Sequence, residues 1–144
     1  MELDDITGVI LDSALQIHRG TGPGLLESLY EALLASELRR RGLRVDRQRL
    51  IRVSYDAVNV EDAFRADLLV DERVIVEVKS QERLAPVHAQ QLLTYLRLTN
   101  LRVGLLLNFG AETMKEGVKR VVNDYTPSPT SPLRINRVRR DQAE

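Results

Sequence analysis

Three charged residues lie within two segments that the sequence otherwise marks as buried β-strands. Residues 66–70 and 74–78 are apolar runs separated by the polar residues 71–73, a pattern that predicts a hairpin of two buried strands. The charged residues in or next to these runs are Asp67, Glu77 and Lys79. A buried charge is costly unless it is paired or holds a metal ion. The pattern therefore predicts that this hairpin carries a functional site.

The length of the hairpin loop decides whether Asp67 joins the other two charges. Side chains alternate along a strand, so Glu77 and Lys79 share one face with Ile75. A three-residue loop at 71–73 places Asp67 opposite Glu77, and directly opposed residues point to the same face. A two-residue loop would place Asp67 opposite Val76 and turn its carboxylate away. The chemistry considered below requires the odd-length loop or a bulge.

Composition is that of an ordinary globular protein. The 144 residues suffice for one domain with a sizeable core, and 43% are hydrophobic and 29% charged. No apolar run approaches the roughly 20 residues that span a bilayer, and the acidic residues after Met1 are unlike a signal peptide. We expect a cytoplasmic protein with no membrane partner. The absence of cysteine excludes disulfides and thiolate chemistry.

Net charge gives no support for a nucleic-acid partner, because 21 basic residues balance 21 acidic ones. The distribution is more informative, since residues 39–52 contain seven arginines and a single acid, Asp46. A solvated helix end followed by an exposed strand face is the favoured interpretation. A patch that follows a phosphate backbone is the alternative.

Periodicity along the chain predicts an α/β fold with a mixed β-sheet flanked by helices, in the order α-α-β-β-β-α-β. Helices are expected at 3–18, 25–41 and 86–100, and strands at 43–55, at the hairpin and at 102–108. The last strand should lie beside the hairpin through a crossover. The pattern does not specify the type of element at 114–123. Residues 1–125 form the expected domain, and the Pro-, Ser- and Arg-rich residues 126–144 a flexible tail.

Two of these helices present polar residues on a single side. Glu27 and Tyr30 share a stripe with Leu34 in the second helix, although Glu27 could simply stabilise the helix N-terminus. The third helix has three such residues on one side: His88, Gln91 and Tyr95. Tyr95 is equally well explained as a core residue with its hydroxyl at the rim, and His88 as a surface residue.

These motifs together resemble a known group of enzymes. An Asp followed by Glu-x-Lys on the next strand resembles the PD-(D/E)xK nuclease superfamily, and Gly24-x-x-Glu27-x-x-Tyr30 resembles the signature of its GxxExxY family. The resemblance extends over roughly residues 3–125, through the segments RADLLV, VIVEVKS, HAQQLLTYL and GLLLNFG. Gln91-x-x-x-Tyr95 is similar to an element of nuclease modules in recombination helicase-nucleases and phage exonucleases. The resemblance implies a restriction-endonuclease-like core.

The resemblance also implies a metal-dependent nuclease that hydrolyses phosphodiester bonds. Carboxylates suit Mg²⁺ or Mn²⁺, and the implied metal ligands are Asp67, Glu77, the carbonyl of Val78, and Glu27 directly or through water. Lys79 would orient the attacking water, and Gln91 would complete the catalytic set. Tyr95, Tyr30 and His88 would position the substrate.

The implied partner is a nucleic acid, with DNA favoured over RNA, and a homodimer could help so short a chain to hold a duplex. Two alternatives remain open. The first is a binding module on the same fold whose acidic pocket is catalytically silent. The second makes Glu77 and Lys79 an exposed ion couple on an edge strand.

Overall fold

The computed structural model describes residues 1–124 and the backbone of residues 133–134. The helices are α1 (Leu3–Thr21), α2 (Glu27–Arg40), α3 (Pro86–Thr99) and the short α4 (Met114–Gly117). The strands are β1 (Val45–Tyr55), β2 (Val58–Val70), β3 (Val74–Lys79), β4 (Val103–Asn108), β5 (Val118–Val122) and β6 (Leu133–Arg134). The predicted order of seven elements is confirmed, and α4, β5 and β6 follow it.

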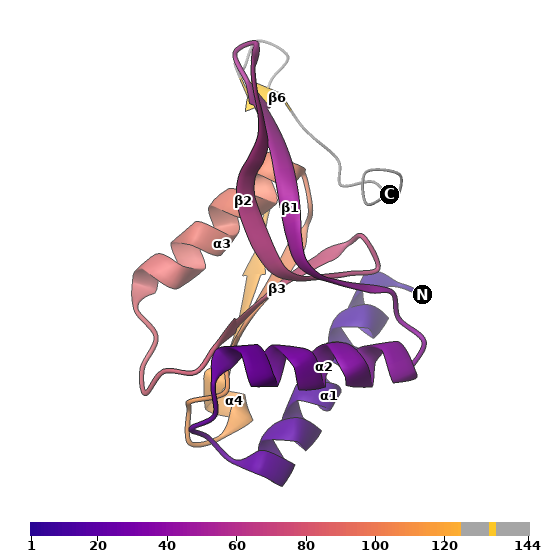
Figure 1. The fold of residues 1–144 in the computed structure, drawn as a ribbon, viewed down its shortest axis with the longest axis vertical. Helices are drawn as coiled ribbons and strands as arrows, with labels where there is room; N and C mark the ends of the chain where they lie inside the picture. The colour runs from indigo at the N-terminus through magenta and orange to yellow at the C-terminus, as the bar shows by residue number, and fades with distance from the viewer. Residues whose placement is uncertain (125–132, 135–144) are drawn as a thin grey trace.

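The strands form one mixed sheet in the order β5-β4-β3-β2-β1-β6 (Figure 1). β3 and β4 run parallel, as a connection through α3 requires, and the other neighbouring pairs are antiparallel. The two segments at which the sequence places charged residues, β2 and β3, therefore lie in the middle of the sheet.

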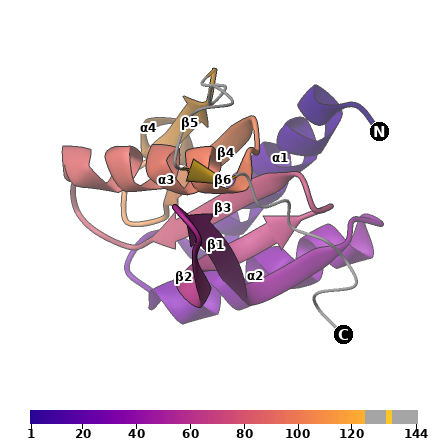
Figure 2. The same ribbon diagram turned by 90° about the horizontal axis from the view of Figure 1, so that it is seen from above.

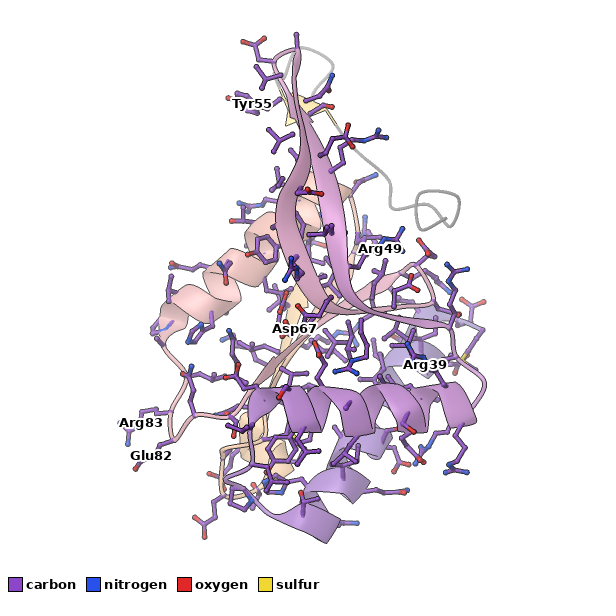
Figure 3. The ribbon with its side chains drawn as sticks, in the orientation of Figure 1. Arg39, Arg49, Tyr55, Asp67, Glu82 and Arg83 are labelled. Atoms are coloured by element: carbon purple, nitrogen blue, oxygen red, sulfur yellow. The ribbon has the colours of Figure 1, made fainter. Side chains whose placement is uncertain are left out.

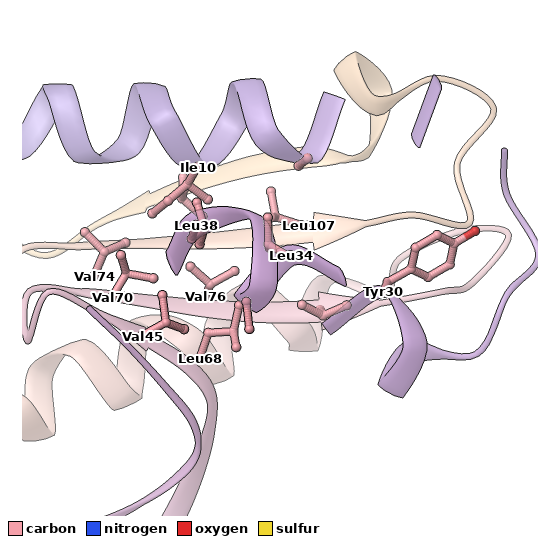
Figure 4. Packing of buried hydrophobic residues seen from close by; sticks show 14 of the residues in the cluster. Ile10, Tyr30, Leu34, Leu38, Val45, Leu68, Val70, Val74, Val76 and Leu107 are labelled. Carbon is pink, nitrogen blue, oxygen red and sulfur yellow. The ribbon is translucent and has the colours of Figure 1, made fainter. Parts of the chain in front are cut away.

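Helices cover both faces of the sheet, which gives the fold two cores (Figure 2). The larger core packs α1 and α2 against the face that carries Val74 and Val76 (Figure 4). The smaller core packs Leu92 and Leu96 of α3 against the face that carries Ile75. The alternation predicted for β3 is therefore observed, and the face shared by Ile75, Glu77 and Lys79 is the one that α3 covers.

The ends of the first two helices differ from the prediction for local reasons. α1 continues to Thr21, whose hydroxyl donates to the carbonyl of Ile17, and it ends at Gly22 with φ 73°. α2 begins at Glu27, two residues later than predicted, because the backbone of Leu25 is used outside the helix. Its amide donates to the Tyr30 hydroxyl, and its carbonyl accepts from Ser80 Oγ.

The β1–β2 hairpin is much longer than the sequence pattern indicated. β2 starts at Val58 instead of Ala66, and its first six residues are exposed. Val58 and Val60 alternate with polar residues, but Glu61 and Asp62 break the alternation, so the segment carries only a short strand signal. We call the paired residues 50–64 the arm. It projects from the rest of the sheet and turns near Tyr55 through Asp56 and Ala57, both in the left-handed region (Figures 1 and 3).

The segment 114–123, whose type was not predicted, forms α4 and the edge strand β5. Most of the predicted tail at 126–144 lies outside the described residues, but Leu133 and Arg134 pair with Tyr55 and Ser54 of β1. No helix in the described part of the chain has the length and apolar character needed to cross a membrane.

Gly110 allows the loop after β3 to pack tightly on the end of β4. A Cβ at Gly110 would lie 2.3 Å from the Gln81 carbonyl oxygen, and the side chain of Asn108 exchanges hydrogen bonds with the same backbone. We expect Gly110→Ala to lower the free energy of unfolding by about 1–3 kcal/mol, since backbone must move. Gly8→Ala, in an exposed helical site with open space, should raise it by about 0.5–1 kcal/mol. Urea denaturation measures both, and equal effects would contradict the expectation.

Candidate active site

The site lies at a fork in the sheet, where β2 leaves β3. The pairs Leu68–Val76, Leu69–Ile75 and Val70–Val74 show that the loop has three residues, as the proposed chemistry requires, and the β2–β3 pairing ends at Leu68–Val76. Beyond that point the Asp67 side chain replaces the backbone ladder, because its Oδ2 accepts from the Val78 N–H at 2.8 Å. The carboxylate of Asp67 is thereby held beside β3 at the base of the arm (Figure 3).

Glu77 lies next to Asp67 in a mostly buried position. Burial raises the pKa of Glu77 to about 9, and the neighbouring Asp67 carboxylate acts in the same direction, whereas Lys79 lowers it. The Oε1 atom of Glu77 is buried without a hydrogen-bond partner in the described structure. Two adjacent carboxylates, one with an unpaired oxygen, form an arrangement that costs free energy unless a cation joins them.

The position of Lys79 excludes one of the alternatives above. An exposed ion couple requires an edge strand, but β3 lies between β2 and β4, and both Glu77 and Lys79 are at most partly exposed. The backbone of Lys79 is also held against the residue that follows β4, because its carbonyl accepts from the Phe109 N–H at 2.8 Å. The interpretation of Glu77 and Lys79 as a solvent-face pair is therefore wrong.

Glu27 lies across a cavity from Asp67. The cavity has a volume of about 200 Å³ and is lined by Glu27, Ser28, Glu31, Gln48, Asp67 and Val78. Glu27 is the first residue of α2, and its Oε2 accepts from the Ser80 N–H at 3.2 Å. Glu27 therefore links α2 to the residue that follows Lys79. The cavity opens on the α2 side of the fork, whereas Glu77 lies toward α3.

The predicted convergence of acids is only partly present. Among residues 1–124, no three His, Asp or Glu side chains are grouped so that they could hold a metal ion together. The structure brings Asp67 and Glu77 together and places Glu27 in the wall of the adjoining cavity. These positions agree better with a metal ion held directly by two carboxylates, those of Asp67 and Glu77, than with one held directly by all three. Glu27 would then lie outside the direct ligands.

Three residues of the cavity wall, Ser28, Glu31 and Gln48, were not among the predicted site residues, and two of them contact each other. Glu31 is 5% exposed, and its carboxylate accepts from Arg47 Nη2 at 3.0 Å and from the Gln48 side-chain amide at 2.5 Å. The same Gln48 amide donates to Asp67 Oδ1 at 3.4 Å. Glu31 is one helical turn after Glu27, so its position on the same stripe was a usable signal. No sequence signal marks Gln48.

The backbone of Gln48 is unusual for a strand. Its φ is 51°, although pairing continues in unchanged register on both sides, with Arg47 opposite Leu68 and Arg49 opposite Ala66. A non-glycine residue in this region costs of the order of 1–3 kcal/mol and is found where the surroundings impose it, often at functional sites. The continuing register places Gln48 opposite Asp67.

The α3 side of the fork carries Gln91 and Tyr95. Burial raises the pKa of Tyr95, and Glu77 and Asp67 act in the same direction, whereas the Gln91 side chain lowers it. The phenol therefore lies near both carboxylates. Its ring stacks on Phe64 of β2 with ring centroids 3.9 Å apart, which joins α3 to the base of the arm. His88 is half-buried in the first turn of α3, and its role stays a prediction.

Tyr30 has a position that differs from the expected substrate contact. Its side chain is fully buried and stacks on Phe109 with centroids 4.4 Å apart. Its hydroxyl donates to the Gly22 carbonyl and accepts from the Leu25 N–H. A buried side chain bonded in this way cannot touch a substrate in this conformation. Tyr30 instead holds the loop that precedes Glu27.

Most charges of the arginine-rich segment are already paired. Ion pairs with acids involve Arg40, Arg41, Arg44, Arg47, Arg49 and Arg52, and Arg39 donates to the Val45 carbonyl. Arg49 is itself buried, with Asp46 and Glu72 as partners (Figure 3). The segment is thus neither a simply solvated face nor a patch of free positive charge. Its pairing weakens the interpretation as a track for phosphates.

Comparison with known proteins agrees with this architecture. Residues 4–121 match the model of the family described as the PD-(D/E)XK nuclease superfamily. No curated protein and no solved structure is significantly similar to the chain. The family match covers most of the chain, and the mixed sheet flanked by helices agrees with the restriction-endonuclease-like fold of that superfamily. The chain therefore belongs to the PD-(D/E)XK nuclease superfamily.

Divalent metal ions are generally used in this superfamily, and the residues at the fork suit such an ion. The unpaired Oε1 of Glu77 and the carboxylate of Asp67 are hard oxygen donors, and Val78 lies beside them in the cavity wall. Mg²⁺ commonly binds through only one or two carboxylates and keeps several waters. The donor set therefore fits Mg²⁺ or Mn²⁺, with Glu27 in a position to act through water.

Proposed function

We propose that this chain is a metal-dependent nuclease of the GxxExxY type, which hydrolyses phosphodiester bonds of DNA at the fork between β2 and β3. The observation that carries the proposal is the placement of Asp67 by the Val78 N–H beside Glu77, whose Oε1 has no partner. Asp67, Glu77 and the Val78 carbonyl would hold Mg²⁺ or Mn²⁺. Such an ion offsets charge on phosphoryl oxygens and lowers the pKa of water.

The side chains around the fork have distinct roles in the proposed hydrolysis. Water attacks phosphorus, one P–O ester bond breaks, and the leaving oxygen gains a proton while the water loses one. Lys79 orients the attacking water and stabilises negative charge in the transition state, because its ammonium shares a strand face with Glu77. Gln91 and Tyr95 approach from α3 and position the substrate strand, since Tyr95 lies near both carboxylates.

The proposal is tested by incubating the protein with single- and double-stranded DNA and RNA in the presence of Mn²⁺. We expect cleavage of DNA that EDTA abolishes. Lys79→Ala should lower the rate about 100-fold, the lower end of the cost of losing one group that stabilises transition-state charge. The matched control is Lys119→Ala, an exposed lysine on β5, which should retain full activity. Cleavage that survives Lys79→Ala would count against the proposed mechanism.

A catalytically silent binding module is the second candidate, and one observation favours it. Glu27 joins no three-residue acidic cluster with Asp67 and Glu77 in the described chain. Calorimetric titration with Mn²⁺ separates the candidates, because a nuclease needs metal affinity at the fork and a silent module does not. Nucleic-acid binding without Mn²⁺ affinity or cleavage would support the silent module.

A further inference from the structure

We propose that Gln48, held by Glu31, is a positioning residue that fixes the orientation of the Asp67 carboxylate. The inference rests on the proposed function, since it concerns the geometry of the same site. It concerns Gln48 and Glu31, neither of which is among the site residues predicted from the sequence motifs.

The first support is the arrangement of hydrogen bonds around Asp67. Its Oδ2 accepts from the Val78 N–H at 2.8 Å, and its Oδ1 faces the Gln48 amide nitrogen at 3.4 Å. The two donors approach the two oxygens from different strands, β3 and β1. Together they restrict rotation of the carboxylate about its last bond, which the Val78 contact alone would leave partly free.

The second support is the way in which the Gln48 amide is itself held. Its nitrogen donates to Glu31 Oε1 at 2.5 Å, and the other Glu31 oxygen accepts from Arg47 at 3.0 Å. Glu31 is buried on α2, so its charge must have donors. The chain of contacts runs from Arg47 through Glu31 and Gln48 to Asp67. It connects α2 and β1 to the carboxylate at the fork.

The third support is the backbone of Gln48. Glycine or asparagine would be the natural residue for a φ of 51°, and the strand continues in unchanged register around this position. A glutamine at such a point needs a reason in its side chain. The reason that the structure offers is the pair of hydrogen bonds to Glu31 and Asp67.

Gln48→Gly tests the inference, because glycine suits the backbone conformation and removes the side chain that carries the amide. In the metal-free protein, hydrogen exchange at the Val78 amide should accelerate about tenfold as Asp67 becomes mobile, while exchange at Val76, within the paired part of β3, stays unchanged. By calorimetry, the dissociation constant for Mn²⁺ should rise about tenfold, the lower end of what loss of a partner behind a metal ligand costs. The melting temperature should change little, because relief of the left-handed backbone offsets the loss of one donor to buried Glu31.

The matched control is Ala57→Gly, which relieves the same left-handed conformation at the turn of the same hairpin, where φ is 67°. It should leave Val78 exchange and Mn²⁺ affinity unchanged. Glu31→Gln keeps an acceptor for Gln48 and should preserve most of the Mn²⁺ affinity, whereas Glu31→Leu should reproduce the effect of Gln48→Gly. In the double variant of Glu31→Leu and Gln48→Gly, the losses should not add, because both act through one contact.

Unchanged Val78 exchange and unchanged Mn²⁺ affinity in Gln48→Gly would overturn the inference. Additive losses in the double variant would do the same, since Gln48 and Glu31 would then act separately. A wild-type protein that binds Mn²⁺ but cleaves no nucleic acid would refute the proposed function alone. The exchange and calorimetric results would still decide the role of Gln48.

Discussion

Asp67→Asn should lower the nuclease rate at least about 1000-fold, the upper end of the cost of removing one preorganised electrostatic group. The asparagine side chain has nearly the same shape, and its carbonyl oxygen can still accept from the Val78 N–H, so the backbone of the fork should keep its geometry even though the new amide nitrogen cannot accept from Gln48. What it loses is the negative charge beside Glu77 that a divalent cation requires. Rates with Mn²⁺ and the heat of Mn²⁺ binding should therefore fall together.

The matched control for this experiment is Asp62→Asn, which changes an exposed acid on the arm. It should retain the wild-type rate and Mn²⁺ affinity. Urea denaturation of both variants checks that the fold is intact. An Asp67→Asn protein that still binds Mn²⁺ and cleaves DNA would show that the metal site lies elsewhere in the chain.

Tyr30→Ala should lower the free energy of unfolding by about 3–5 kcal/mol, the range for removal of a buried aromatic side chain. Tyr30 is fully buried, stacks on Phe109 and holds the loop before Glu27 through its hydroxyl (Figure 4). Urea denaturation of the metal-free protein measures the effect.

Two further variants separate the contributions of Tyr30. Tyr30→Phe keeps the ring and removes only the hydroxyl, so the loss should be about 0.5–1.5 kcal/mol. Tyr55→Ala removes a tyrosine that is 55% exposed at the turn of the arm and should change stability by no more than about 0.5 kcal/mol. Equal losses for Tyr30→Ala and Tyr55→Ala would contradict the burial of Tyr30.

The central part of the fold could be predicted from local patterns. Two apolar runs around three polar residues predict the β2–β3 hairpin, whereas its register, left open between two- and three-residue loops, is given by the structure. Pro86 marks the first residue of α3, and the apolar run after it becomes β4 beside β3. The outer part of the arm was not predicted because the alternation of Val58 and Val60 with polar residues ends at Glu61 and Asp62, which leaves only a short strand signal.

The candidate site could be predicted only where motif residues lie on the hairpin itself. Asp67 and Glu77 meet because each lies directly beyond the last pair of the hairpin, Leu68–Val76, on the same face of its strand. The positions of Gln48 and Glu31 depend on how α2 and β1 pack on the hairpin, and no local pattern encodes a left-handed residue within a strand. The expected substrate contact of Tyr30 is wrong for a related reason. Helical spacing places Tyr30 on the same stripe as Glu27, but it does not show that the side chain is fully buried.

Because the arm leaves the sheet at the fork, its outer half lies beyond both cores. Tyr55, Val58 and Val60 are exposed there, and the turn at Asp56 and Ala57 lies well away from the helices (Figure 1). Insertions or deletions near that turn would leave helix–sheet packing unchanged. The length of the arm can therefore change without altering the candidate site at the fork, so the distance that the arm reaches is set independently of the geometry around Asp67.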